Sequence, residues 1–164
     1  MPKTQAYVTK EQGTKVESMI VDMPEVGPND VKVEMLCSGV CSSDVSMVQN
    51  FWGVTKYPMV AGHEGIGKVV EVGANVKNRK VGDTVGLGWM RESCGACRCC
   101  MSARENLCPD MLGNSVAIFN TCQGTFAEFC VSPEKYACPI PETLDPVTAA
   151  PLMCQSHRPR CASC

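Results

Sequence analysis

The sequence predicts one mainly β domain with short helices, and three observations support this prediction. The chain has 164 residues, of which 45% are hydrophobic, enough to build a single core. Its 14 glycines and 11 prolines are scattered without a period, which is typical of many turns and excludes a coiled coil or a helical bundle. Short apolar segments recur between these turns, as they do in a β-barrel or a sandwich.

The strand predictions start from two segments with clear patterns. Residues 31–36 (VKVEML) alternate apolar and polar side chains with a period of two, and residues 67–72 (GKVVEV) are rich in β-branched residues and bounded by glycines. Turn-forming sequences such as VGPND and VGD separate the shorter candidates. These candidates cover residues 84–87, 125–131 and 136–139.

Helical signals are sparse and confined to two places. Ser42 or Ser43 is suited to cap a short helix that runs towards Gln49. An Asp-Pro pair, with the residue types preferred at the N-cap and first helical position, precedes a helix expected over residues 147–154. Pro151 should strain or shorten this second helix, because proline has no backbone N–H to donate.

The charge balance restricts the kind of partner. A net charge of -2 and a pI near 5.7 leave no broad basic face, which argues against nucleic acid and favours a small-molecule ligand. No apolar run approaches the roughly 20 residues of a membrane-spanning helix, and the first residues lack the apolar segment of a signal peptide. We therefore expect no membrane association and a cytoplasmic location.

The 13 cysteines are the unusual feature of the composition. An odd number, in a chain expected to remain in the cytoplasm, favours metal ligation or free thiols over a disulfide framework. Four of them follow the pattern C-x2-C-x2-C-x7-C, with Cys99 as an extra thiol inside it; they are Cys94, Cys97, Cys100 and Cys108. Four thiolates this close in sequence can surround a tetrahedral zinc ion.

The energetics of residues 94–108 support a metal in this loop. Ordering the backbone of these residues costs on the order of 15–30 kcal/mol, and only Met101 and Leu107 are sizeable apolar anchors. A structural zinc contributes about 10–16 kcal/mol, which offsets most of this cost. A reduced loop without metal and an iron–sulfur cluster are the weaker alternatives.

A second group of donors is dispersed along the chain. Cys41, His63 and Cys154 would form a three-ligand site with an open fourth position, as in catalytic zinc sites, if the fold brought them together. Spacing alone is weak evidence for this site, because a single buried histidine or cysteine is more often part of a core.

Six motifs carry a resemblance to a known family. They are GVCSSD (39–44), YPMVAGHEGIGKVVEVG (57–73), VGDTVGLG (81–88), SCGACRCCMSARENLC (93–108), TFAEF (125–129) and AAPLMC (149–154). In this order they resemble the zinc-dependent alcohol dehydrogenases of the medium-chain dehydrogenase/reductase superfamily, most closely the cinnamyl alcohol dehydrogenase-like branch. The resemblance implies a GroES-like β-barrel catalytic domain, two zinc ions per chain, and interconversion of alcohols and aldehydes with NADP or NAD.

The resemblance also implies roles for individual residues. Cys41, His63 and Cys154 would bind the catalytic zinc, with Glu64 as an occasional or outer ligand. The four loop cysteines, Cys94, Cys97, Cys100 and Cys108, would bind the structural zinc. Cys99 has no role in the family pattern and could compete with Cys100 for metal or be oxidised.

Residues 42–44 follow the first ligand and correspond to three further roles. Ser43 corresponds to the hydroxyl that passes the substrate proton outward, and Asp44 to a carboxylate that orients the histidine ligand. Ser42 departs from the family pattern, in which a histidine near the cofactor phosphates is usual, so it puts the cofactor preference in question.

Three aromatic residues are candidates to line the alcohol side of the pocket. Phe51, Trp52 and Trp89 would form an apolar wall that excludes water and accepts an aryl or alkyl group. Packing in the core is the equally weighted alternative for each of them.

The glycine-rich turn of a dinucleotide-binding domain is missing. No G-x-G-x-x-G motif follows a predicted strand, so we expect no Rossmann domain and a cofactor site in a domain that this chain lacks. We expect residues 1–154 to form the catalytic domain and residues 155–164 to be a divergent, disordered tail. The abrupt loss of resemblance after Cys154 indicates a truncated or frame-shifted product.

Two classes of function therefore remain open. The first is the catalytic domain of an alcohol dehydrogenase, whose family is usually homo-oligomeric; whether the chain is active on its own stays open, because it lacks a cofactor site. The second is a non-catalytic zinc-binding module that acts only through metal or partner binding.

Overall fold

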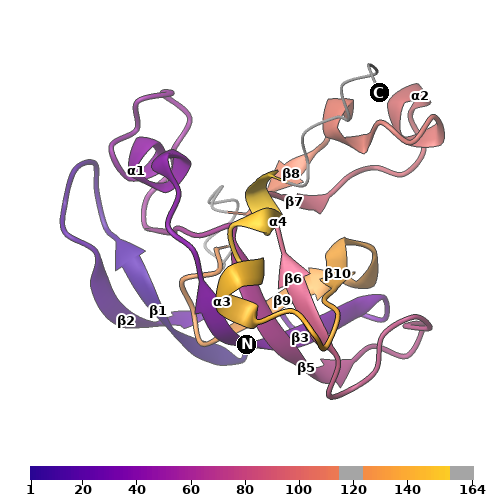
Figure 1. The fold of residues 1–164 in the computed structure, drawn as a ribbon. Coiled ribbons are helices and arrows are strands. Elements are labelled where there is room, and N and C mark those ends of the chain that lie inside the picture. The colour runs from indigo at the N-terminus through magenta and orange to yellow at the C-terminus, as the bar shows by residue number, and fades with distance from the viewer. Residues whose placement is uncertain (115–123, 156–164) are drawn as a thin grey trace.

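A five-stranded antiparallel sheet forms the centre of the computed structural model, which describes residues 1–114 and 124–155 (Figure 1). The strand order is β10-β6-β5-β3-β9. The strands are Asp30–Ser38 (β3), Gly65–Val72 (β5), Thr84–Leu87 (β6), Phe129–Pro133 (β9) and Ala137–Pro139 (β10). Every strand pair within the two described ranges is antiparallel, so the predicted mainly β class with short helices is confirmed.

A second sheet, of order β2-β1-β4, packs against the first. Its strands are Lys3–Thr9 (β1), Glu17–Asp22 (β2) and Met59–Val60 (β4). The segment before β9 connects the two sheets: the amide of Tyr7 donates to the carbonyl of Phe126 and the amide of Glu128 donates to that of Gln5, each at 2.8 Å. The strand expected over residues 125–131 begins only at Phe129, because the preceding residues bond to β1 instead.

The core lies where the two sheets face each other. Val31 and Val33 on β3 are completely buried, whereas Lys32 between them faces outward, as the period-two pattern predicts. Each such valine contributes roughly 1.5–3 kcal/mol by leaving water. The buried residues of this cluster are Ala6, Val8, Val31, Val33, Val60, Val69, Val85, Leu87, Ala127, Cys130 and Ala137.

The first helix, Ser42–Val48 (α1), begins before either predicted cap allows, because Ser42 and Ser43 both lie inside the helix. Cys41 is the N-cap, and its backbone N–H donates to Asp44 Oδ2 at 2.9 Å. The assignment of Ser42 or Ser43 as the cap was therefore wrong. This bond from the N-cap amide to the carboxylate three residues later is half of a capping box, and it starts the helix at Ser42.

The C-terminal helix is divided as the proline predicts. Pro146–Ala149 (α3) and Leu152–Gln155 (α4) are single turns on either side of Pro151. Asp145 caps the first turn, since its Oδ2 accepts from the amide of Thr148 at 3.0 Å.

A two-stranded ribbon projects from the sheets and carries the cysteine-rich loop (Figure 1). Its strands are Met90–Glu92 (β7) and Leu112–Gly113 (β8). The loop between them contains Arg98–Met101 (α2) and the 3-10 turn Glu105–Leu107 (η1); a second 3-10 turn, Glu134–Tyr136 (η2), follows β9.

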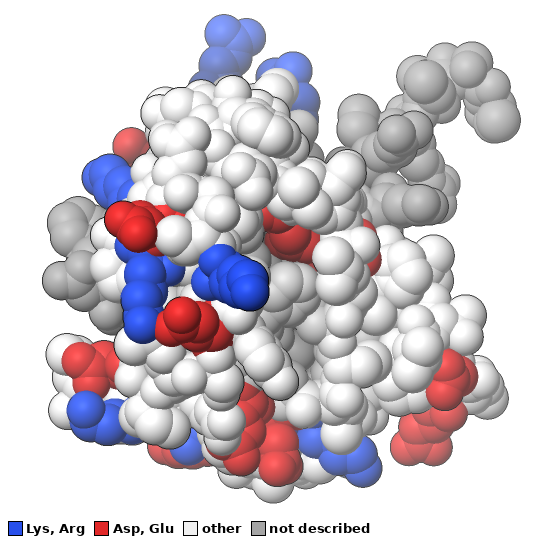
Figure 2. Space-filling view, turned by 90° about the vertical axis from the view of Figure 1, so that its left-hand side faces the viewer, with Lys and Arg blue, Asp and Glu red and all other residues white. Residues whose placement is uncertain are grey.

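The distribution of charge and the lengths of the helices agree with the composition. On the face shown in Figure 2, Lys and Arg side chains are interspersed with Asp and Glu side chains, and neither sign dominates. Within residues 1–114 and 124–155, no helix has the length and apolar character needed to cross a membrane.

Candidate metal centres

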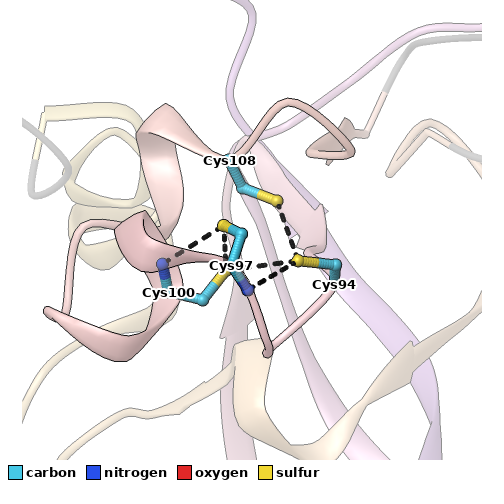
Figure 3. Close-up of side chains that lie close together, drawn as sticks. All are labelled: Cys94, Cys97, Cys100 and Cys108. Atoms are coloured by element: carbon cyan, nitrogen blue, oxygen red, sulfur yellow. Dashed lines mark hydrogen bonds between the residues drawn. The ribbon is translucent and has the colours of Figure 1, made fainter.

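The four cysteines of the projecting loop point their sulfur atoms toward one another (Figure 3). The Sγ–Sγ distances are 3.6 Å from Cys94 to Cys108, 3.6 Å from Cys97 to Cys100 and 3.9 Å from Cys94 to Cys100. Four sulfurs bound to one zinc ion at about 2.3 Å would stand about 3.8 Å apart, at the corners of a tetrahedron. The loop cluster (Cys94, Cys97, Cys100, Cys108) therefore fits a zinc ion in both donor type and size.

Backbone amides hold the sulfurs in place. The amide of Cys97 donates to Cys94 Sγ at 3.3 Å, and the amide of Cys100 donates to Cys97 Sγ at 3.5 Å. Between the first two ligands, Gly95 has a φ of 69°, a left-handed conformation that glycine adopts without strain. The two-residue spacers between Cys94, Cys97 and Cys100 thus bring their three sulfur atoms into one cluster.

The thiols of the loop cluster have widely different pKa values. Backbone amides of Ala96 and Cys97 lower the pKa of Cys94 to about 7. The backbone amide of Cys100 lowers the pKa of Cys97, but burial and the neighbouring thiols prevail and raise it to about 12. One thiolate therefore opposes ionisation of the next, and a divalent cation would remove this opposition.

Polar contacts attach the loop to the rest of the domain. Glu105 of η1 forms an ion pair with Lys135 of η2 at 2.8 Å, and the hydroxyls of Ser93 and Tyr136 lie 2.5 Å apart. The expected apolar anchors do not contribute, because Met101 and Leu107 are 77% and 57% exposed. Neither hydrophobic burial nor a long helix therefore stabilises the loop.

We expect Glu105→Gln to loosen the loop slightly. Lys135 keeps the pKa of the Glu105 carboxyl below its ordinary value of 4.5, so the pair is fully charged at neutral pH and would be lost only as the pH falls through the lowered pKa. An exposed pair of this kind contributes less than about 1 kcal/mol. Hydrogen exchange of residues 94–108 at pH 7 should rise up to about fivefold, and high salt should abolish the difference between variant and wild type. Equal exchange at low salt would contradict this contribution.

A second cluster brings together donors that are far apart in the chain. Cys41, His63, Glu64 and Cys154 each offer one ligand atom, and these atoms all lie within 4.8 Å of one another. Cys41 caps α1, His63 and Glu64 directly precede β5, and Cys154 lies on α4. This mixed-donor cluster is mostly enclosed, since His63 is 1% and Glu64 7% exposed.

Asp44 fixes the orientation of the histidine. Its Oδ1 lies 3.0 Å from His63 Nδ1 and also accepts from the amide of Gly62 at 3.0 Å, while its Oδ2 accepts from the amide of Cys41. The carboxylate therefore organises both chain segments that supply the first donors. Because Nδ1 is bound to Asp44, Nε2 is the nitrogen left to face the cluster.

The titration of the mixed-donor cluster indicates a place for a cation. Burial acts to raise the pKa of Cys41, but hydrogen bonds from the backbone and hydroxyl of Ser43 outweigh it and lower the pKa overall. Burial acts to lower the pKa of His63, and its hydrogen bond with Asp44 raises the pKa instead. Burial first, and the charge of Cys41 second, raise the pKa of Cys154 to about 11. The Cys41 thiolate thus opposes ionisation of Cys154, and a bound cation would remove this opposition.

The comparison with known families agrees with this arrangement. Residues 27–142 match the family model described as the alcohol dehydrogenase GroES-like domain. The chain belongs to this family. The predicted GroES-like fold and the predicted family are thus confirmed.

Relatives of this alcohol dehydrogenase domain include enzymes of the expected branch. The chain is 38% identical over 150 residues to an alcohol dehydrogenase of Geobacillus stearothermophilus, covering 91% of this chain and 43% of the relative. It is 44% identical over 131 residues to cinnamyl alcohol dehydrogenase 1 of Capsicum annuum, covering 78% and 37%. A solved cinnamyl alcohol dehydrogenase structure from Sorghum bicolor superposes with a TM-score of 0.90 at 31% identity, covering 94% and 45%. The alcohol dehydrogenase domain thus spans less than half the length of these relatives.

The other predicted site residues of the alcohol dehydrogenase domain lie at different distances from the mixed-donor cluster. Ser43 Oγ is 3.7 Å from Cys41 Sγ, and Ser42 is exposed at the start of α1. The ring of Trp89 meets His63 edge to face, with centroids 5.4 Å apart. Phe51 and Trp52 follow α1 and are 71% and 51% exposed, so plain core packing is wrong for both.

Within the loop cluster, Cys100 rather than Cys99 supplies the third sulfur. The backbone carbonyl of Cys99 instead accepts from Arg104 at 2.8 Å, which holds the end of α2. Residues 155–164, expected to be a disordered tail, lie outside the described residues apart from the backbone of Gln155.

Two glycines of the alcohol dehydrogenase domain contribute to the mixed-donor cluster and were missed as site residues. A Cβ on Gly39 would stand 2.1 Å from Glu64 Oε2, so any side chain there would displace the carboxylate from its present position. Gly62 has a φ of 103° and presents its amide to Asp44. Gly62 directly precedes His63, and Gly39 stands two residues before Cys41, which is the signal that could have identified them.

Proposed function

We propose that this chain is the metal-binding and alcohol-binding part of an NAD(P)-dependent oxidoreductase that interconverts primary alcohols and aldehydes. One observation carries the proposal: two thiols and an imidazole nitrogen from three distant segments meet beside a buried carboxylate, with Asp44 holding the imidazole. The names of several relatives support it, since these are alcohol and cinnamyl alcohol dehydrogenases.

The donor set of the mixed-donor cluster suits a catalytic zinc ion. Cys41, His63 and Cys154 would hold the ion, and Glu64 lies close enough to be an occasional ligand. Thiolate and imidazole are the ligands zinc prefers, and three of them leave a position for the substrate. When bound, zinc lowers the pKa of an alcohol and polarises an aldehyde carbonyl.

The residues around the cluster would handle the proton and exclude water. The Ser43 hydroxyl, half-buried beside Cys41, would accept the proton of the alcohol O–H and pass it towards solvent. Asp44 keeps the proton of His63 on Nδ1, so the imidazole stays in one tautomer. Trp89 covers one side of the imidazole and would shield the reacting carbon from water, with Phe51 and Trp52 as further contacts to an aryl or alkyl group.

The hydride from the alcohol carbon would go to NADP or NAD. Two solved neighbours, from Helicobacter pylori and Sinorhizobium meliloti, are complexes with NADP(H) or NADP, which supports this class of acceptor. We propose that a domain beyond this chain binds the cofactor, and that exposed Ser42 at the start of α1 contacts it. In this proposal the residues described here bind the alcohol or aldehyde, and the other domain binds the cofactor.

Counting the metal ions tests this proposal. Native mass spectrometry should find two zinc ions on the wild-type chain and one on Cys41→Ala, because only the mixed-donor cluster loses a ligand. Cys138→Ser is the matched control: this exposed cysteine of β10 belongs to neither cluster, so two ions should remain. One ion on the wild type that persists in Cys41→Ala would overturn the proposed catalytic site.

A further inference from the structure

The third donor of the mixed-donor cluster stands on an unusually short support. Cys154 lies on α4, a single turn that begins after Pro151 and is closed by two backbone bonds, Met153 N–H to Ala150 O at 3.1 Å and Cys154 N–H to Pro151 O at 3.2 Å. A turn of this length has no stability of its own, because nucleating a helix costs more than its first hydrogen bonds return. Tertiary contacts must therefore set the position of Cys154.

Met153, the neighbour of Cys154, makes these contacts. Its side chain is 6% exposed and packs in a cluster with Ile66, Ile140, Ala149 and Ala150. The sulfur of Met153 occupies the space above Gly86 in β6: a Cβ on Gly86 would stand 2.0 Å from its Sδ and 3.0 Å from its Cγ. Because Gly86 has no side chain, it leaves a recess on β6, and the side chain of Met153 fills this recess.

The backbone of Gly86 does not explain why a glycine is present. The residue does not belong to the glycines with positive φ, so an alanine could adopt its conformation. Gly86 is also held on both sides, paired with Ile66 of β5 and Cys138 of β10. A shift of this strand would disturb pairing on both sides, so an added methyl group should instead displace Met153 from the recess.

The recess also relates Cys154 to the other donors. Leu87, next to Gly86, pairs with Gly65, which directly follows His63 and Glu64 in the chain. His63 and Glu64 thus lie at the end of β5 that pairs with β6. At the same end, Met153 packs on Gly86 and holds the turn that bears Cys154. A shift of Met153 out of the recess would move Cys154 while His63 and Glu64 remained in place.

We propose that Gly86 and Met153 are positioning residues for the mixed-donor cluster: the methionine seated on the glycine places Cys154 within reach of the metal. This inference rests on the proposed catalytic site. Gly86→Ala should displace Met153 and weaken metal binding there by roughly 10- to 100-fold, the usual effect of losing support behind a metal ligand. The loop cluster should be unaffected, because it lies in the loop between β7 and β8, which projects from the sheets (Figure 1).

Alkylation of individual cysteines, read by mass spectrometry, tests the inference without an activity assay. A cysteine bound to zinc resists alkylation, so Cys154 should be protected in the wild type. Gly86→Ala should expose Cys154 and leave the four cysteines of the loop cluster protected. Met153→Ala should also expose Cys154, whereas Met153→Leu, which conserves the volume, should retain protection.

Two further variants separate positioning from general damage. Gly86→Ala acts only through Met153 in this inference, so the double variant Gly86→Ala with Met153→Ala should expose Cys154 to the same degree as Met153→Ala alone. Leu152→Ala truncates a 43% exposed side chain on the same turn and should change nothing. Continued protection of Cys154 in Gly86→Ala, or faster alkylation in the double variant than in Met153→Ala, would overturn the inference. Unprotected Cys154 in the wild type would instead overturn the proposed catalytic site on which it depends.

Discussion

Replacing Cys97 with alanine is expected to unfold residues 94–108 while both sheets stay folded. Ordering this loop costs on the order of 15–30 kcal/mol of backbone entropy, and a four-thiolate zinc site returns about 10–16 kcal/mol. The two largest apolar residues of the loop, Met101 and Leu107, are exposed and return almost nothing. Limited proteolysis and hydrogen exchange should therefore locate the change between β7 and β8, with loss of one zinc ion per chain.

The loop supplies its own control for this experiment. Cys99→Ala removes the same kind of side chain two residues further on, but its sulfur is not among the clustered ones, so the loop should stay protected. Cooperative unfolding of the whole chain in Cys97→Ala would show that the loop is an integral part of the domain. Protection retained in Cys97→Ala would show that zinc is not what holds it.

The second large effect is expected for Asp44→Ala, which should both destabilise the domain and empty the mixed-donor cluster. The carboxylate accepts hydrogen bonds from the amides of Cys41 and Gly62 and from His63, and it is 3% exposed. Leaving three buried donors without an acceptor costs about 1–3 kcal/mol for each. The sum is a large part of the about 5–15 kcal/mol that stabilises an ordinary domain. Urea unfolding measures the loss, and zinc counting on the folded fraction measures the effect on the cluster.

Two further variants, Asp44→Asn and Asp22→Asn, test whether the hydrogen bonds of the Asp44 carboxylate cause this effect. Asp44→Asn keeps an oxygen for Gly62 and His63 but turns an amide N–H towards the N–H of Cys41, so it should lose part of the stability. Asp22→Asn removes an exposed carboxylate 3.6 Å from Lys3 and should change the free energy of unfolding by less than about 1 kcal/mol. Equal unfolding curves for Asp44→Ala and Asp22→Asn would refute the role given to the buried carboxylate.

The sequence predicted the strands that have a strong pattern of their own. β3 and β5 alternate or concentrate β-branched residues, and both were expected within two residues of their observed limits. β1 was missed because its buried face consists of Thr4, Ala6 and Val8, whose small side chains contrast weakly with their exposed neighbours. The two-residue strands β4 and β8 exist only through their pairing partners and carry no local signal.

The two clusters differ in how far the sequence could define them. The loop cluster is local, so the spacing of its cysteines was enough to predict convergence. The mixed-donor cluster joins residues 41, 63 and 154, and its spacing says nothing about distance; only resemblance to a family connected these residues. The recess at Gly86 had no signal at all, since a glycine in a strand can mark a bulge, a bend or close packing.

The separation of Cys154 from the other ligands has a consequence for biosynthesis. The four sulfurs of the projecting loop leave the ribosome together, so that loop can capture its ion while the remainder is still being translated. The other assembly stays incomplete until the chain has been extended through Pro151 and its final thiol has emerged, a few seconds later at ordinary elongation rates. If both clusters bind zinc as proposed, the loop cluster should acquire its ion before the mixed-donor cluster does, and ribosome-bound nascent chains ending before Cys154 should carry one zinc.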